Sequence, residues 1–255
     1  MISRRAISTG IAATVTVLAA GCGGGATHTP VVPATRNSTS AAPGARPARP
    51  VAASPGTAAT RTSLPPFATA VSRPLRRADL PFSWRPGCPV PPGLLRAIRL
   101  SFVGFDGKAH AGEIIVNSRV VRDVIKVFSI LYRARFPIMK MEPVDAFHGS
   151  DARSMAADNT SGFNCRLAVA AGPPHWSMHA YGLAIDVNTV QNPYLEAGHR
   201  AQPPAGAAYT DRTDIRPGMA YPGGVLVSAF RSVGWGWGGE WPGSPDYQHF
   251  SVNGR

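Results

Sequence analysis

Acidic residues are scarce in this chain and almost missing from its first third. The 255 residues include 26 Lys and Arg against 14 Asp and Glu, a formal net charge of +12. Up to Leu80 there are nine Arg and one acidic residue, Asp79, so +8 of the charge lies there and +4 in the remainder. Nucleic-acid binding needs basic residues clustered on a folded surface or motif. Here the charge follows a tail, which argues against a nucleic-acid partner and favours attraction to an anionic envelope.

Long hydrophobic runs are also scarce. Residues 6–20 form an apolar run after Arg4-Arg5, too short to span a bilayer comfortably and typical of a signal-peptide core. Leu18-Ala19-Ala20-Gly21-Cys22 resembles a lipoprotein cleavage box, in which Cys22 is lipidated and becomes the mature N-terminus. We therefore expect residues 1–22 to be a lipoprotein-type signal peptide that anchors the protein to the cell membrane, facing the cell wall. An ordinary secretory signal, giving a secreted protein, is the alternative.

Large apolar residues are nearly absent from the next segment, residues 23–79, which is rich in Ala, Pro, Thr, Ser and Arg. Such a segment cannot bury enough surface to offset its ordering entropy, so we expect disorder. Its prolines stiffen it into a spacer between an anchor and a folded part, although it could equally be low-complexity filler. A single folded domain is then expected over residues 80–255.

Periodicity gives a coarse picture of that domain. Strands are expected at 94–105 and 113–116, and a helix capped by Asn117 or Ser118 continues through the apolar positions up to Tyr132. Residues 138–147 look extended, 151–166 and 191–224 look like long loops, and 225–233 like a short helix. Loops of that length are more often functional than idle.

Cysteine is rare as well, with three in the chain. If Cys22 is the lipid site, Cys88 and Cys165 remain as a pair. In an exported protein they can form one disulfide, joining the start of the domain to the loop before His179. The alternative is a pair of metal ligands, which the lack of any Cys-x-x-Cys grouping disfavours.

Two short stretches carry the residues that suggest chemistry. His179 and Asp186 lie seven positions apart, and His249 lies near the C-terminal end of the chain. Strand alternation after Gly182 puts Leu183, Ile185 and Val187 on one face and Asp186 on the other. Two histidines and a carboxylate are the ligand set of a catalytic zinc ion that keeps its fourth position for water.

A hydrolytic site also needs a proton acceptor and a second electrophile. Asp246 lies three residues before His249, close enough in a turn and strand to act as the base. Arg166 and Arg153 precede His179 and are the candidates for stabilising an oxyanion. The alternation of Gly and Trp at residues 234–239 either lines a cleft or places core indoles beside a tight turn.

At these residues the chain resembles the bacterial zinc peptidases of the D-alanyl-D-alanine carboxypeptidase and L-alanyl-D-glutamate endopeptidase family. The family pattern Ser-x-His-x-x-Gly-x-Ala-x-Asp stands here as Ser177, His179, Gly182, Ala184 and Asp186, followed by Asp246, His249 and Phe250. The likeness also takes in residues 160–166, 192–194 and 237–239 and covers about residues 94–252.

The resemblance implies a compact α+β domain with a central antiparallel sheet and flanking helices, similar to hedgehog and DD-peptidase folds. It implies one Zn²⁺ held by His179, Asp186 and His249, with Asp246 as the base. For the family's substrate-facing arginine it favours Arg166, which closes the 163–166 segment, with Arg153 in reserve. The expected substrates are peptidoglycan stem peptides, and the expected state is a monomer.

Three hypotheses follow. The first is an anchored metallopeptidase that cuts either the terminal D-Ala-D-Ala bond or an internal L-to-D bond of the stem. The second is a wall-binding module that keeps the zinc fold without catalysis. The third is a lipoprotein that captures a small ligand in a Trp-rich pocket. Metal content separates the third from the others, and stem-peptide cleavage separates the first from the second.

Overall fold

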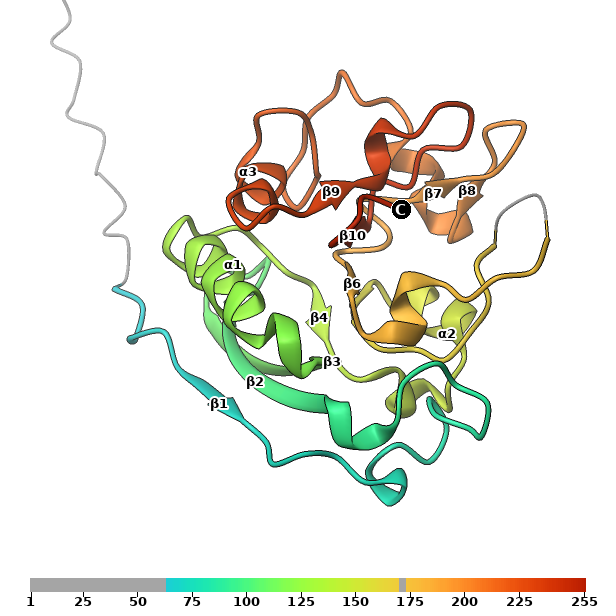
Figure 1. Cartoon of the computed structure of the whole chain (residues 1–255). Helices are drawn as coiled ribbons and strands as arrows, with labels where there is room; N and C mark the ends of the chain where they lie inside the picture. Colours follow the sequence, from blue (N-terminus) through green and yellow to red (C-terminus); the bar gives the residue numbers. More distant parts are fainter. Residues whose placement is uncertain (1–62, 170–172) are drawn as a thin grey trace, which may run out of the picture. The chain divides into compact units, whose positions relative to one another are not determined.

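The structure is a computed structural model that describes residues 63–169 and 173–255 (Figure 1). The expected signal peptide, Cys22 and the linker up to residue 62 lie outside the described residues. All described residues belong to one compact unit, residues 59–255. The fold is mixed α/β, with several small sheets and few helices, as the sequence predicts. Among the described helices, none has both the length and the apolar character of a membrane span.

The first sheet is the scaffold of the domain. Its order is β1 (Thr69–Val71), β2 (Leu95–Val103), β3 (Ala109–Asn117), and both pairings are antiparallel. The two long strands confirm those expected at 94–105 and 113–116. β1 pairs with β2 through Thr69 opposite Leu100, so the sheet begins upstream of the domain boundary expected at residue 80 and inside the segment expected to be a linker.

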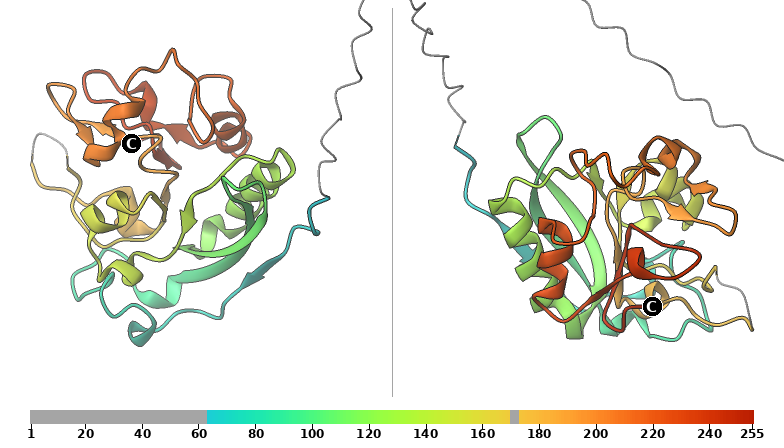
Figure 2. Two further views of the ribbon diagram at one scale, coloured as in Figure 1. Left: turned by 180° about the vertical axis from the view of Figure 1, so that it is seen from behind. Right: turned by 90° about the horizontal axis from the view of Figure 1, so that it is seen from above.

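Helix α1 (Val121–Arg133) packs on this sheet as its periodicity predicts. The Asn117 side chain accepts a hydrogen bond from the Arg119 amide (3.1 Å) and starts a 3₁₀ turn, Ser118–Val120, that leads into the helix. The buried stripe of α1 contains Val124, Val127, Phe128, Leu131 and Tyr132. α1 contacts β2 and α3 (Val225–Arg231), and the two helices lie side by side (Figures 1 and 2).

The second sheet contains the short strands β6 (Ala184–Asp186), β10 (His249–Ser251) and β9 (Gly236–Trp237), in that order and antiparallel. Phe250 is fully buried and stacks on Phe230 of α3, with ring centroids 4.2 Å apart. Trp237 also stacks on Phe250, with ring centroids 6.3 Å apart. Trp235 and Trp237 are therefore core indoles, not cleft walls, because both are almost completely buried.

Three expectations for the remaining segments need correction. The region 151–166 is not one loop, because it contains α2 (Asp151–Ala156) and β5 (Asn159–Thr160). The stretch 138–147 pairs only at β4 (Lys140–Met141), parallel to β5, and ends in a 3₁₀ turn, Val144–Phe147. The long excursion 191–224 contains the hairpin β7 (Tyr194–Leu195) and β8 (Ala201–Gln202), followed by a 3₁₀ segment, Pro204–Tyr209.

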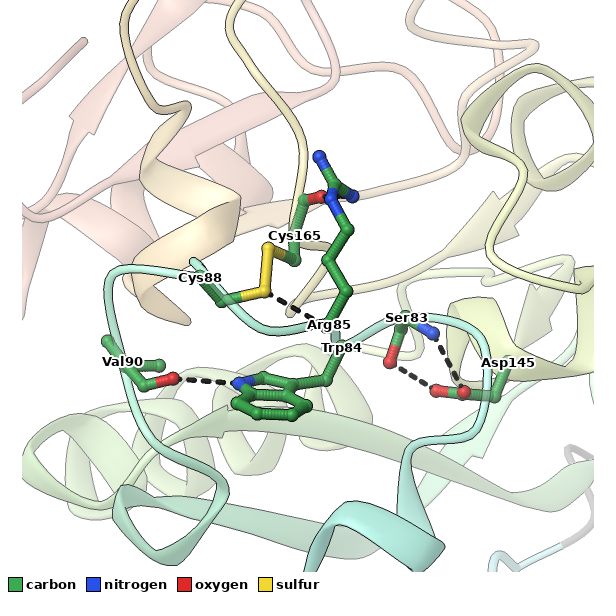
Figure 3. Close-up of a disulfide and its surroundings, with 7 residues drawn as sticks. All are labelled: Ser83, Trp84, Arg85, Cys88, Val90, Asp145 and Cys165. Carbon is green, nitrogen blue, oxygen red and sulfur yellow. Dashed lines mark hydrogen bonds between the residues drawn. A yellow bond between two sulfur atoms is a disulfide. The ribbon is translucent and has the colours of Figure 1, made fainter.

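Cys88 and Cys165 form a disulfide, with Cα atoms 5.8 Å apart, which removes them as metal ligands (Figure 3). The Arg85 side chain runs beside the bridge and donates to the Cys165 carbonyl at 2.6 Å. On the same segment the indole N–H of Trp84 donates to the Val90 carbonyl at 2.9 Å. The bridge thus fixes the chain just before Arg166 to the N-terminal part of the domain.

Candidate metal centre

The side chains of His179, Asp186 and His249 meet at one end of the paired strands β6 and β10. His179 belongs to a 3₁₀ turn, Met178–Tyr181, whose first amides are capped by the Ser177 hydroxyl, which accepts from His179 N at 3.3 Å. Asp186 ends β6 and His249 begins β10, and these two residues are directly paired across the strands. The site is thus assembled by one turn and one strand register.

Gly182 joins the His179 turn to β6, at a position where any side chain would clash with the neighbouring backbone. Its φ of +65° lies in the left-handed region, and a Cβ built there would lie 2.7 Å from the Asn117 amide nitrogen. Its carbonyl accepts from that amide at 2.8 Å, which fastens the His179 turn to the end of β3. A side chain at this position would displace His179 relative to Asp186.

The three side chains converge on one point. The Nε2 atom of His179 lies 3.1 Å from Nδ1 of His249 and 3.1 Å from Oδ2 of Asp186. The Nδ1 atom of His249 lies 3.3 Å from Oδ1 of Asp186. Tetrahedral zinc with bonds near 2.1 Å separates its ligand atoms by about 3.4 Å, so the spacing fits a metal ion.

The other nitrogen of each imidazole has a partner that orients the ring. Nδ1 of His179 lies 2.6 Å from the Gly162 carbonyl, and Nε2 of His249 lies 3.2 Å from the main-chain oxygen of Arg255. A proton on each of these nitrogens donates to that oxygen. The opposite nitrogen then faces the shared point with its lone pair, as metal ligation requires.

The electrostatics favour a cation at this point. His179, Asp186 and His249 are all at most 5% exposed. Burial opposes the ionisation of Asp186, but the charges and hydrogen bonds of His179 and His249 outweigh it and hold the pKa of this carboxyl well below its usual range. A buried carboxylate between two imidazoles is a group that could hold a metal ion.

The Asp246 carboxyl lies beside this group, with one of its oxygens unpaired within the described part of the chain. Its amide donates to the Gly238 carbonyl at 2.9 Å, which turns the chain into β10. Its Oδ1 atom is buried and has no hydrogen-bond partner among the described residues. Burial and then the charge of Asp186 raise the pKa of Asp246 to about 7, against the opposing effects of His249 and Arg166. A carboxyl with such a pKa can exchange protons near neutrality.

Asp246 and His249 line a cleft of about 1090 Å³. Its walls come from α2, residues 166–169 and 175–181, the β7–β8 hairpin and the C-terminal residues from Trp241 onward. Arg166 lines it, whereas Arg153 is exposed on α2 and is not among the lining residues. The structure thus brings Arg166 to the cleft together with Asp246 and His249, and leaves Arg153 outside.

Sequence reasoning missed several cleft residues. The aromatic wall is formed by Trp176, Tyr194 and Trp241 and not by the Gly/Trp run at 234–239. Trp176 and Trp241 stand alone in polar or Pro-rich surroundings, where no periodicity assigns them to the core. An isolated aromatic residue outside any apolar pattern is therefore the sequence signal that could have indicated these cleft residues.

Comparison with known proteins places this site in a family. Residues 171–252, which include His179, Asp186, Asp246 and His249, match the family model for D-alanyl-D-alanine carboxypeptidase. Comparisons with curated proteins and with solved structures found no match. The resemblance seen in the sequence motifs is confirmed over residues 171–252, the segment of the candidate metal centre that matches this D-alanyl-D-alanine carboxypeptidase family model.

Proposed function

We propose that this protein is a zinc-dependent peptidase that hydrolyses amide bonds in peptidoglycan stem peptides. Membership of a carboxypeptidase family suggests a peptidase. The observation that carries the proposal is the buried group of His179, Asp186 and His249 together with the nearby carboxyl of Asp246. Asp246 and His249 line the same cleft, and Oδ1 of Asp246 has no hydrogen-bond partner among the described residues. Structural zinc sites fill all four positions with protein ligands, whereas three ligands and an adjacent carboxyl favour catalysis.

The residues divide the work as follows. His179, Asp186 and His249 would hold the zinc ion, which would supply a Lewis acid that lowers the pKa of a water molecule toward about 7. Asp246 accepts the proton of the attacking water and returns it to the leaving amine, for which a pKa near 7 is suited. Arg166 contributes positive charge at the cleft wall, where it can bind an anionic group of the substrate or stabilise the oxyanion.

The target bond is the terminal D-Ala-D-Ala amide or an L-Ala-D-Glu type amide within the stem. Both substrates present carboxylates, which could pair with Arg166 in a cleft that is also lined by aromatic side chains. We further propose that the protein works as a monomer outside the cell, tethered through lipidated Cys22 and the Pro-rich segment. The basic tail supports attraction to an anionic envelope.

The test is to incubate the full chain with defined stem peptides, with and without a chelator, and to analyse the products by mass. Chelator-sensitive release of D-Ala identifies a carboxypeptidase, and a cut within the stem identifies an endopeptidase. If the protein binds one zinc ion but cleaves none of the stem peptides, the peptidase proposal is wrong, and a non-catalytic cell-wall-binding lipoprotein is favoured. A protein that binds no metal contradicts both.

A further inference from the structure

Arg166 is held at the cleft wall by an acidic residue to which sequence reasoning gave no role. Nε of Arg166 lies 2.9 Å from Oδ1 of Asp151, and both residues line the cleft. The N–H does not point along the line to the oxygen, so the contact is an ion pair without hydrogen-bond geometry. The two side chains are 24% and 26% exposed, which leaves the pair reachable by a ligand in the cleft.

Asp151 is itself fixed on two sides. It begins α2, where the Ser150 hydroxyl caps the helix by accepting from the Arg153 amide at 3.3 Å. Its Oδ1 also accepts from Nδ2 of the buried Asn164 at 3.3 Å. The main-chain N–H of Asn164 in turn donates to the His179 carbonyl at 3.2 Å. The carboxylate is thus tied to the turn that carries His179.

Two of the three guanidinium nitrogens of Arg166 have partners in the protein, and the third has none among the described residues. Its Nη1 donates to the Leu167 carbonyl at 3.3 Å, and its Nε faces Asp151. Nη2 makes no hydrogen bond to any described residue. The Arg166 carbonyl accepts from the Ser177 amide at 3.1 Å, which fixes the backbone as well. In an arginine fixed in this way, Nη2 is a charged donor in a set position that can bind a carboxylate oxygen.

We propose that Asp151 is a positioning residue that orients the Arg166 guanidinium to receive a carboxylate of the peptide substrate. The inference rests on the proposed function. Ordering a free arginine side chain opposes binding, and an ion pair already formed in the free protein removes part of that cost. A partly exposed ion pair adds little to folding stability, so the effect of Asp151 belongs in substrate affinity.

A double-mutant cycle of Asp151→Asn and Arg166→Met in the full, zinc-loaded chain tests this role. The readouts are kcat and KM for a stem peptide, and the Kd of the same peptide measured by the fluorescence of Trp176 and Trp241. We expect Asp151→Asn to raise KM and Kd about tenfold with kcat nearly unchanged, and to have no further effect in the Arg166→Met background. Peptides with either the terminal or the internal carboxylate converted to an amide identify which group Arg166 receives.

A matched control is available in the ion pair of Arg73 and Asp79, which lies outside the cleft. Asp79→Asn should leave KM and Kd unchanged. The role of Asp151 is overturned by an unchanged KM, by equal losses with and without Arg166, or by loss of zinc in Asp151→Asn. If Asp151→Asn does not fold, Asp151→Glu replaces it in the double-mutant cycle. A loss of affinity that depends on Arg166 then supports the role of Asp151, and a loss that is equal without Arg166 contradicts it.

Failure of this inference is distinguishable from failure of the proposed function. Cleavage by the wild type without coupling between Asp151 and Arg166 contradicts the inference alone. Peptide binding without cleavage contradicts the peptidase proposal and leaves the cycle readable through Kd. A wild type that neither cleaves nor binds the peptide contradicts both.

Discussion

The two three-stranded sheets of this domain have different bases for their stability. β2 and β3 are nine residues long, pair along their whole length and bury an apolar face under α1. β6, β9 and β10 have two or three residues each and carry Asp186 and His249 among their paired positions. Both sheets bury apolar residues in one core, but the second sheet also places charged and polar groups in the interior, where they depend on neighbouring residues for partners.

The largest effect is expected from removing a candidate ligand in the second sheet. His249→Ala deletes one of three metal-binding side chains and leaves Asp186 with one imidazole partner. We expect loss of stoichiometric zinc and of all measurable hydrolysis, since three ligands are the minimum seen in catalytic zinc sites. Metal content by mass spectrometry and activity on a stem peptide measure the two effects. Full zinc occupancy in this variant would remove His249 from the ligand set.

The next effect separates proton transfer from metal binding. Asp246→Ala removes a buried carboxyl whose Oδ1 has no hydrogen-bond partner among the described residues. Turnover should fall by about 10²–10⁴-fold because only the proton acceptor is lost. Zinc content should stay at one, and stability should hold or rise, since an unsatisfied buried polar group is costly in the folded state. Near wild-type turnover would show that another group is the base.

A pair of core substitutions sharpens the contrast between the sheets. Phe128→Ala on α1 and Phe250→Ala on β10 each remove an almost fully buried ring, and each should cost about 3–5 kcal/mol of unfolding free energy. Zinc affinity should fall only in Phe250→Ala, because Phe250 follows His249 and stacks on Phe230. Denaturant unfolding and zinc titration give the two quantities. Equal zinc affinities in the two variants would mean that the core behind the site does not position His249.

The same contrast explains what sequence reasoning could predict. β2, β3 and α1 follow from apolar periodicity, and His179, Asp186 and His249 stand in a spaced motif that requires no knowledge of the fold. α2 was not predicted because its six residues are too few to show an apolar periodicity. Its N-terminal cap is a single hydrogen bond to the Ser150 hydroxyl, which gives only a weak sequence signal.

β1 was missed for a related reason. Its three residues are exposed and lie in a Pro-rich stretch, and they form a strand only because β2 presents an open edge. The pairing of Asp151 with Arg166 depends on where α2 sits, so no local pattern could reveal it. Long apolar segments carry their own structural information, whereas short polar ones take their structure from their neighbours.

The smallest of these effects concerns the disulfide, which joins the segment before β2 to the segment before the His179 turn. Cys88 and Cys165 are 77 positions apart, and the bridge restrains the segment that ends at Arg166. A Cys88→Ser/Cys165→Ser double variant should lose about 2–4 kcal/mol of stability, mainly because its unfolded chain is less restricted. His179 keeps its own bonds to Gly162 and Asn164, so zinc should remain bound. KM should rise, because Arg166 loses one of the restraints that hold it in the cleft. Thermal unfolding, zinc content and kinetics test these points together, and a variant that loses zinc while still folded would place the bridge among the supports of the metal centre.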